Sequence, residues 1–205
     1  MPAIVAPIFL LSPAKAGGRR YAILTNEKAD FDLALKFRAG SATIGEIYSF
    51  ISGLYFRGKM AYAAAFGAAP PPSSSAFVIV PGLGLLPPRT VFSPEQLRST
   101  AQVDVDENNS VHHDALLAAA ASLDRATGQQ CSFVLLGSVA SAKYTTALLK
   151  VLDHRLLFPA EFVGLGDMSR GAIMLRSAAS GQELTYIPVS GSQLRGPRPP
   201  RINPK

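Results

Sequence analysis

Cysteine and tryptophan are scarce in this 205-residue chain, which has one cysteine, Cys131, and no tryptophan. A single cysteine excludes an internal disulfide bond and a zinc site built from cysteines. Cys131 stands just before the apolar run 133–136, where a cysteine is usually a small core residue. A reactive thiol needs a polarising neighbour, so we favour a structural role over a nucleophilic one.

Histidine is also rare. His112 and His113 are adjacent, so on a helix they point about 100° apart and do not bind one metal ion as an i, i+4 pair does. With Asp114 they resemble a solvated helix start, and His154 stands alone. The carboxylates of 103–109 share one exposed loop and show no convincing acid/base spacing. We expect no metal site and no cofactor.

No apolar run reaches the roughly 18 residues that a transmembrane helix needs. The apolar opening 2–11 lacks a positive n-region and a small-residue cleavage site, and Arg19 and Arg20 lie after it. We therefore expect a cytoplasmic protein without a membrane partner.

Acidic residues are outnumbered 14 to 20 by basic ones, which gives a formal net charge of +6. Four cations without an acidic partner lie in the last stretch: Arg195, Arg198, Arg201 and Lys205. This balance favours polyanionic partners without proving one. The pattern predicts one α/β domain over 1–189 and an extended Pro/Arg-rich basic tail over 190–205.

Strands and helices are expected to alternate along the chain. The expected strands are 3–11, 21–24, 77–80, 133–136, 155–158 and 184–189. The expected helices are 26–37, two across 43–66 with the second near 56–66, a brief turn after Ser93-Pro94, 112–126, 141–152 and 168–178. Such alternation predicts a mainly parallel central sheet flanked by helices on both faces.

Capping motifs and breakers set the expected boundaries. Thr43-x-x-Glu46 is a capping box, in which each side chain satisfies a free backbone amide at a helix start. Ser93 caps a turn that has proline at its first helical position. Residues 81–88, with three prolines and two glycines, should break all regular structure.

Four segments that follow or adjoin expected strands are candidates for a shared site: 12–20, 81–89, 137–143 and 164–170. In parallel sheets, ligands bind in the crevice beyond the carboxyl ends of the strands. We expect these segments to meet at one rim of the sheet and to hold an anion. Oligomeric state is not indicated.

Two of these segments combine a small-residue turn, a helix start and a cation. In 164–171, Gly164 and Gly166 permit a tight turn, Asp167 caps the following helix, and Ser169 and Arg170 lie in its first turn. In 137–143, Ser138 or Ser141 caps a helix or binds an anion, with Lys143 as a point charge. The alternative for both is ordinary helix capping with surface cations. Neither segment is a dinucleotide fingerprint or a Walker motif.

Ser12 and Lys15 have the Ser-x-x-Lys spacing of some acyl-transferring enzymes. Companion motifs are absent and the setting is a strand end, so we favour anion contacts by Lys15, Arg19 and Arg20 instead. Tyr55, Arg57, Lys59 and Tyr62 form an aromatic–basic cluster suited to stacking on bases and neutralising phosphate. The alternative is an amphipathic helix with half-buried tyrosines and cations in water.

Two motifs carry a family resemblance. Leu10-Leu11-Ser12-Pro13-Ala14-Lys15 is similar to the opening of the bacterial peroxide-stress proteins. The segment 47–63 resembles small uncharacterised domains distantly related to them, which also have glycines after the central strand, like Gly82 and Gly84, and a last loop like Gly164-Leu165-Gly166. The resemblance implies the fold and a link to stress response, since the larger relatives are associated with DNA binding and iron homeostasis.

Three functions stay open at this point. The first is a domain that binds a phosphate-bearing ligand, nucleic acid or nucleotide, at the loops after the strands. The second is an enzyme acting on a nucleoside-like or phosphate-ester molecule through Ser12, Lys15, Ser169 and Arg170, although no general base accompanies them. The third is a non-catalytic module that docks a partner through its tail.

Overall fold

The fold is built on one six-stranded sheet. The computed structural model describes residues 7–68, 74–128, 131–139 and 141–192. The strand order is β3-β2-β1-β4-β5-β6. The four inner strands are parallel, and the two edge strands run antiparallel to their neighbours. The expected α/β architecture is therefore confirmed, whereas residues 193–205 of the expected tail lie outside the described residues.

The strands are β1 (Pro7–Leu11), β2 (Ala76–Val80), β3 (Gly84–Leu86), β4 (Ser132–Leu136), β5 (Leu156–Pro159) and β6 (Tyr186–Pro188). The α-helices are α1 (Gly18–Leu24), α2 (Asp32–Arg38), α3 (Ile44–Ile51), α4 (Leu54–Phe66), α5 (Pro94–Ala101), α6 (Ser110–Thr127), α7 (Ala142–Leu152) and α8 (Asp167–Ser180). Two 3-10 turns, η1 (Asp153–Arg155) and η2 (Ala160–Phe162), flank β5.

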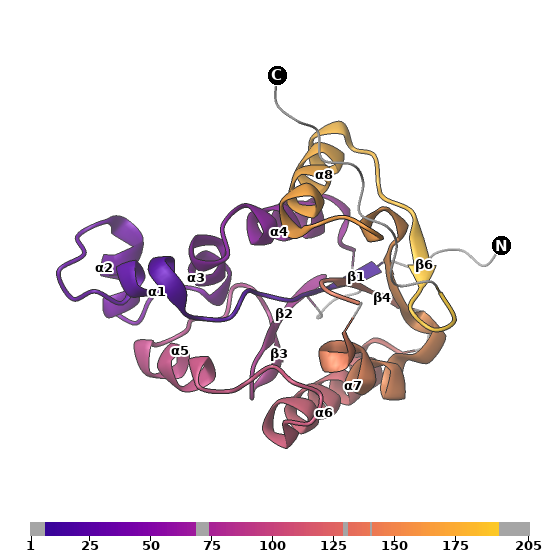
Figure 1. The fold of residues 1–205 in the computed structure, drawn as a ribbon, viewed down its shortest axis with the longest axis horizontal. Helices are drawn as coiled ribbons and strands as arrows, with labels where there is room; N and C mark the ends of the chain where they lie inside the picture. Colours follow the sequence, from indigo (N-terminus) through magenta and orange to yellow (C-terminus); the bar gives the residue numbers. More distant parts are fainter. Residues whose placement is uncertain (1–6, 69–73, 129–130, 140, 193–205) are drawn as a thin grey trace.

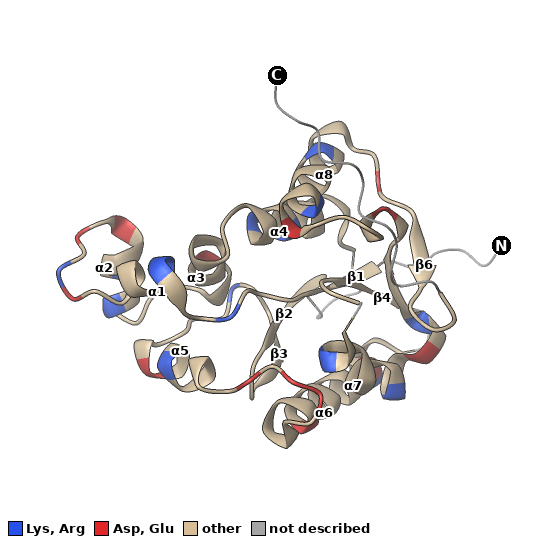
Figure 2. Cartoon of the chain, viewed as in Figure 1, with Lys and Arg blue, Asp and Glu red and all other residues tan. Residues whose placement is uncertain are grey.

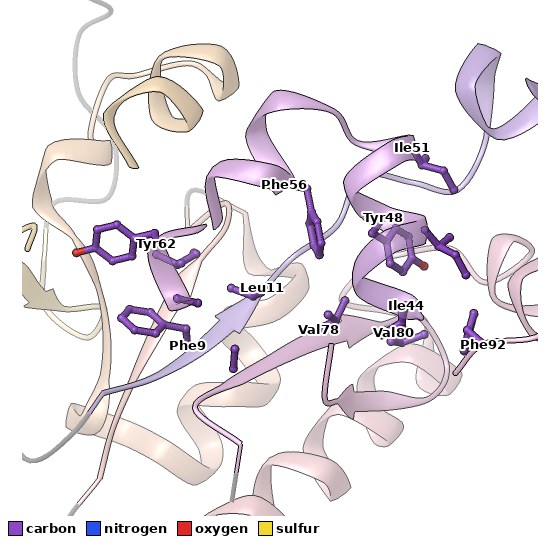
Figure 3. Close-up of a cluster of buried hydrophobic side chains, with 14 of the residues drawn as sticks. Phe9, Leu11, Ile44, Tyr48, Ile51, Phe56, Tyr62, Val78, Val80 and Phe92 are labelled. Carbon is purple, nitrogen blue, oxygen red and sulfur yellow. The ribbon is translucent and has the colours of Figure 1, made fainter. Parts of the chain in front are cut away.

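Helices cover both faces of the sheet (Figure 1), so the central strands β1 and β2 are apolar and buried at every position. Alternate residues of β1 point to opposite faces. Phe9 and Leu11 belong to a core shared with α1 to α5 and α8, and Ile8 and Leu10 to a core shared with α6 and α7. Figure 3 shows the first core, with Phe56 and Tyr48 packed above the strand side chains.

The expected capping box at Thr43 and the expected cap at Ser93 are both present, and the second is also a capping box. The Thr43 hydroxyl accepts a hydrogen bond from the Glu46 amide, and the Glu46 carboxylate accepts one from the Thr43 amide. Ser93 and Gln96 make the same reciprocal contacts at the start of α5. These local bonds fix where α3 and α5 begin.

Thr43→Ala should lower the free energy of unfolding by about 1 kcal/mol, because it removes one side of the capping box at α3. Urea denaturation followed by circular dichroism measures the change. Ser99→Ala, on the exposed face of α5, is the matched control and should be neutral or slightly stabilising. Equal losses in the two variants would contradict the assigned role of the cap.

Two expected elements are wrong. Residues 21–24 form the end of helix α1 and not a strand, and within that helix only Leu24 is buried. Residues 81–88 contain a strand, because the chain turns back after β2 and pairs Val80 with Gly84 in the antiparallel strand β3. Gly82 and Gly84 have φ values of 74° and 80°, which glycine adopts at no steric cost.

Candidate functional site

The carboxyl ends of β1 and β4 define the position of the site. These strands are neighbours, yet the chain leaves β1 for β2 on one side and reaches β4 on the other side later. The connections after β1 and β4 therefore diverge and leave a crevice at this switch point, where open α/β sheets bind their ligands.

A cavity of about 680 Å³ occupies this crevice. Its floor is formed by the residues that follow β1 and β4, and its walls by α4, the first turns of α7 and α8, and the segment between α5 and α6. The volume lies within the range of pockets that hold small molecules and cofactors.

Seven of the expected site residues line this cavity. They are Ser12, Lys15, Tyr55, Lys59, Ser138, Lys143 and Asp167. Three of the four candidate segments therefore meet as expected. The fourth contributes only Pro81, while Leu83 is exposed.

The other expected site residues do not line the cavity. They are Arg19, Arg57, Gly82, Gly84, Ser141, Gly164, Gly166, Ser169 and Arg170. Arg57 borders a separate open depression with Arg20 and Phe50. Gly84 lies against α6, where an added Cβ would be 2.6 Å from the carbonyl oxygen of Ala115.

Arg170 has a structural contact in place of the expected ligand contact. Its Nε and Nη2 atoms donate to the carbonyl oxygen of Phe162 at 3.2 and 3.0 Å. The expected cap at this helix is also wrong, because Asp167 is the first residue of α8 and Gly166 occupies the cap position without a side chain to offer. Ser141 is the cap residue of α7 but makes no side-chain capping bond.

Lys59 is the most unusual residue of the site, because a lysine is rarely fully buried. It is 1% exposed, and its Nζ donates to the carbonyl oxygen of Ser12 at 2.5 Å and contacts Ser12 Oγ at 3.0 Å. The same Nζ lies 3.8 Å from the ring centroid of Tyr55, one turn earlier on α4. Burial lowers the pKa of Lys59 to about 7, with Asp167 partly opposing the shift. The expectation that the cations of this helix lie in water is wrong for Lys59.

Two tyrosines also line the cavity, the partly buried Tyr55 and the buried Tyr144. Tyr55 Oη is buried and, among the described residues, has no hydrogen-bond partner. Burial raises the pKa of Tyr55 to about 12, and the charge of Arg170 opposes the shift. Burial also raises the pKa of Tyr144, and hydrogen bonding with the Ser12 side chain opposes it. Both phenols are therefore protonated donors at neutral pH.

The acidic segment 103–106 was expected to be solvated, and it forms part of the cavity wall. Figure 2 shows this acidic stretch between α5 and α6. Asp104 forms an ion pair with Lys15 at 2.8 Å, and both side chains are well exposed. The contact lowers the pKa of the Asp104 carboxyl group. Such exposed pairs contribute little to stability, so this one orders the mouth of the cavity more than it stabilises the fold.

Sequence reasoning missed Ser52 and Tyr144 in the site. Ser52 Oγ accepts a hydrogen bond from the Ala14 amide at 3.0 Å and holds the loop after β1. Tyr144 is buried and directly follows Lys143. An aromatic residue next to a candidate cation was the sequence signal that could have placed it in the site.

His112 also differs from expectation. It is 1% exposed, and its Nε2 contacts the carbonyl oxygen of Lys143 at 3.2 Å, so it packs between α6 and α7 instead of facing solvent. Burial lowers its pKa. The expected solvated pair is therefore split, with His113 only partly buried.

The described residues contain neither a metal-binding cluster nor a membrane-spanning helix. No group of three or more His, Cys, Asp or Glu side chains is placed to hold a metal ion. Every helix in the described part of the chain is too short or too polar to cross a lipid bilayer.

Comparisons of the chain with family models, with curated proteins and with solved structures found no match. The resemblance to the peroxide-stress proteins therefore rests on the sequence motifs alone.

Proposed function

We propose that the cavity at the β1–β4 switch point binds a small phosphate-bearing ligand of about mononucleotide size. The observation that carries the proposal is the convergence of Lys143, Ser138 and the uncapped first turn of α7 on a partly open cavity of nucleotide dimensions. Free amides at a helix start, together with a nearby ammonium group, suit a phosphate.

Lys143 is the cation best placed for the phosphate. Its Nζ lies 5.1 Å from the ring centroid of Tyr144 and makes no ion pair within the described residues. Lys15, by contrast, is paired with Asp104, and Lys59 is held by Ser12. The phosphate would therefore lie at the α7 side of the cavity.

The carboxylates of the cavity support a nucleotide over a nucleic acid. Asp104, Asp106 and Asp167 line the same space as the three lysines. Such a balance gives a long polyanion little net attraction but offers acceptors for the hydroxyl and amino groups of a nucleoside. Tyr55 lines the same space, and its protonated phenol supplies one further donor for a ligand.

A thermal-shift titration with the four ribonucleoside monophosphates, the matching nucleosides and inorganic phosphate tests this proposal. At least one monophosphate should raise the melting temperature in a concentration-dependent way, because a ligand that binds only the native state stabilises it. Lys143→Met should weaken that binding roughly 10- to 100-fold, since a hydrogen bond to a charged group is worth about 1.5–3 kcal/mol.

Lys150→Met on the same helix is the matched control, because Lys150 contacts His113 away from the cavity. It should bind like the native protein. The proposal fails if no monophosphate stabilises the protein or if both variants weaken binding equally. A third result would also contradict the proposal. If the protein binds oligonucleotides tightly, with a strong dependence on salt, and does not respond to monophosphates, its ligand is nucleic acid.

A further inference from the structure

Ser12 and Lys59 form a pair that the binding of a phosphate does not require. Ser12 follows the last residue of β1, and its hydroxyl is 3.0 Å from Lys59 Nζ on α4. Both residues line the cavity, although the chain separates them by 47 positions. The Ser-x-x-Lys spacing is therefore misleading here, because Lys15 turns away to Asp104 and Lys59 takes the place beside Ser12.

The two contacts of Lys59 suit a neutral amine acting on a hydroxyl group. One N–H donates to the carbonyl oxygen of Ser12, which fixes the direction of the amine. The charged amine also donates to Ser12 Oγ, but once it has lost a proton its lone pair accepts the Ser12 Oγ–H instead. A nucleophile within hydrogen-bond reach of a base, and a base oriented by a further group, is the arrangement that activates serine.

The surroundings hold the serine in this position. A Cβ added at Gly137, the residue after β4, would lie 2.5 Å from Ser12 Oγ, so only glycine leaves room for the hydroxyl. Ser52 fixes the loop after Ser12 through the Ala14 amide. Tyr144 lines the same cavity as Ser12 and is buried there, so its protonated phenol is a further polar group near the serine.

We propose that Ser12 is the nucleophile and Lys59 the general base of an acyl-transfer reaction on an ester or amide group of the ligand in the cavity. Ser12 Oγ bonds to the carbonyl carbon while its proton passes to Lys59 Nζ. The tetrahedral intermediate expels the alcohol or amine, which takes the proton back from Lys59. Water then attacks the acyl-serine, releases the carboxylic acid and restores Ser12. This inference takes the ligand cavity of the proposed function as its premise.

Several charged groups set the protonation of Lys59. Asp167 of α8 favours its charged form, whereas Arg170 of α8 and Lys143 of α7 oppose it, and burial is the largest influence. Tyr55 faces it from α4 and stays protonated at neutral pH. The base form should therefore increase as pH rises through about 7.

Labelling with a fluorophosphonate and turnover of p-nitrophenyl acetate test the pair. We expect a single covalent adduct on Ser12 by intact mass and peptide mapping, and a burst of p-nitrophenolate as Ser12 becomes acetylated. The labelling rate should rise with pH and level off above about 8. Ser12→Ala should abolish both signals.

Lys59→Met should slow both reactions at least 100-fold and remove the pH dependence, since a positioned general base contributes roughly 10²- to 10⁴-fold. Circular dichroism and a cooperative thermal transition verify that this variant folds. If it does not fold, the pH profile of labelling in the native protein and the Ser12→Ala result decide the matter. Ser99→Ala and Lys150→Met lie outside the cavity and should react like the native protein.

The outcomes separate this inference from the proposed function. Stabilisation by a monophosphate without labelling of Ser12 overturns the nucleophile and leaves the binding site standing. Labelling of Ser12 without any stabilisation by monophosphates overturns the proposed phosphate ligand and leaves the nucleophile standing. An adduct on another residue, or undiminished labelling in folded Lys59→Met, also overturns the pair.

Discussion

The free energy of unfolding should increase as pH rises from 7 to 9.5, with Lys59 contributing up to about 1.4 kcal/mol per pH unit. Burial lowers the pKa of Lys59 in the folded protein to about 7, whereas the unfolded chain keeps the ordinary value of 10.5. Between these values the unfolded state binds the extra proton. Deprotonation therefore favours the folded state, and stability rises with pH.

Other titrating groups limit the pH range in which the contribution of Lys59 can be measured. Burial lowers the pKa of His112, so its contribution lies at lower pH. Burial raises the pKa of Tyr48, Tyr55 and Tyr62 to about 12 from an ordinary value of 10, so these phenols reduce stability once pH exceeds about 10. Chemical denaturation at several pH values between 7 and 9.5 isolates the lysine.

Lys59→Met should flatten this pH dependence. Its absolute stability is less diagnostic, because the substitution removes a buried amino group but also leaves Ser12 without the donor at its carbonyl oxygen. Lys150→Met, which replaces an exposed lysine on α7, should keep the native slope. A flat profile in the native protein, or the same slope in Lys59→Met, would mean that Lys59 stays charged in the folded state.

Much of the fold could be predicted from local sequence. Strand β2 and residues 133–136 of β4 are short continuous apolar runs, and such runs are typical of strands buried on both faces. The starts of α3 and α5 follow from capping boxes, whose partners lie within three residues. These features depend on near neighbours and on burial, and both leave a pattern in the chain.

The errors concern features that distant contacts decide. Residues 21–24 are as apolar as a short strand, yet they continue a helix that buries only Leu24. The strand β3 exists because Val78 and Val80 of β2 offer a free edge across a tight turn. Proline-rich flanks at 81 and 87 conceal that pairing, and tertiary context overrides the local signal.

The site also has one part that the sequence predicts and one part that depends on distant contacts. Its location at the strand ends followed from topology, and three of the four candidate segments meet there. The position of Lys59 did not follow, because its partner Ser12 lies 47 residues away and helical periodicity does not distinguish a buried lysine from a solvated one. The acidic wall 103–106 was missed because its charges indicate solvent exposure unless a cavity is known to adjoin them.

Gly58→Ala should lower the free energy of unfolding by about 1–3 kcal/mol, although alanine is the better helix former. Gly58 and Gly171 lie where α4 and α8 cross, and Figure 1 shows these two helices side by side. A Cβ at Gly58 would lie 2.7 Å from the carbonyl oxygen of Gly171. That neighbour is backbone, so the helices must separate to admit the methyl group. Thermal and urea denaturation measure the loss.

The displacement should also reach the site, because α4 carries Tyr55 and Lys59 and α8 carries Asp167. A Cβ at Gly171 would in turn lie 3.0 Å from the Cα of Tyr55, so the contact is tight from both sides. Gly166→Ala is the control, since nothing lies within 4 Å of its added Cβ, and it should change stability by less than about 1 kcal/mol. If Gly58→Ala is neutral or stabilising, the two helices are not held at the spacing that places Lys59 beside Ser12.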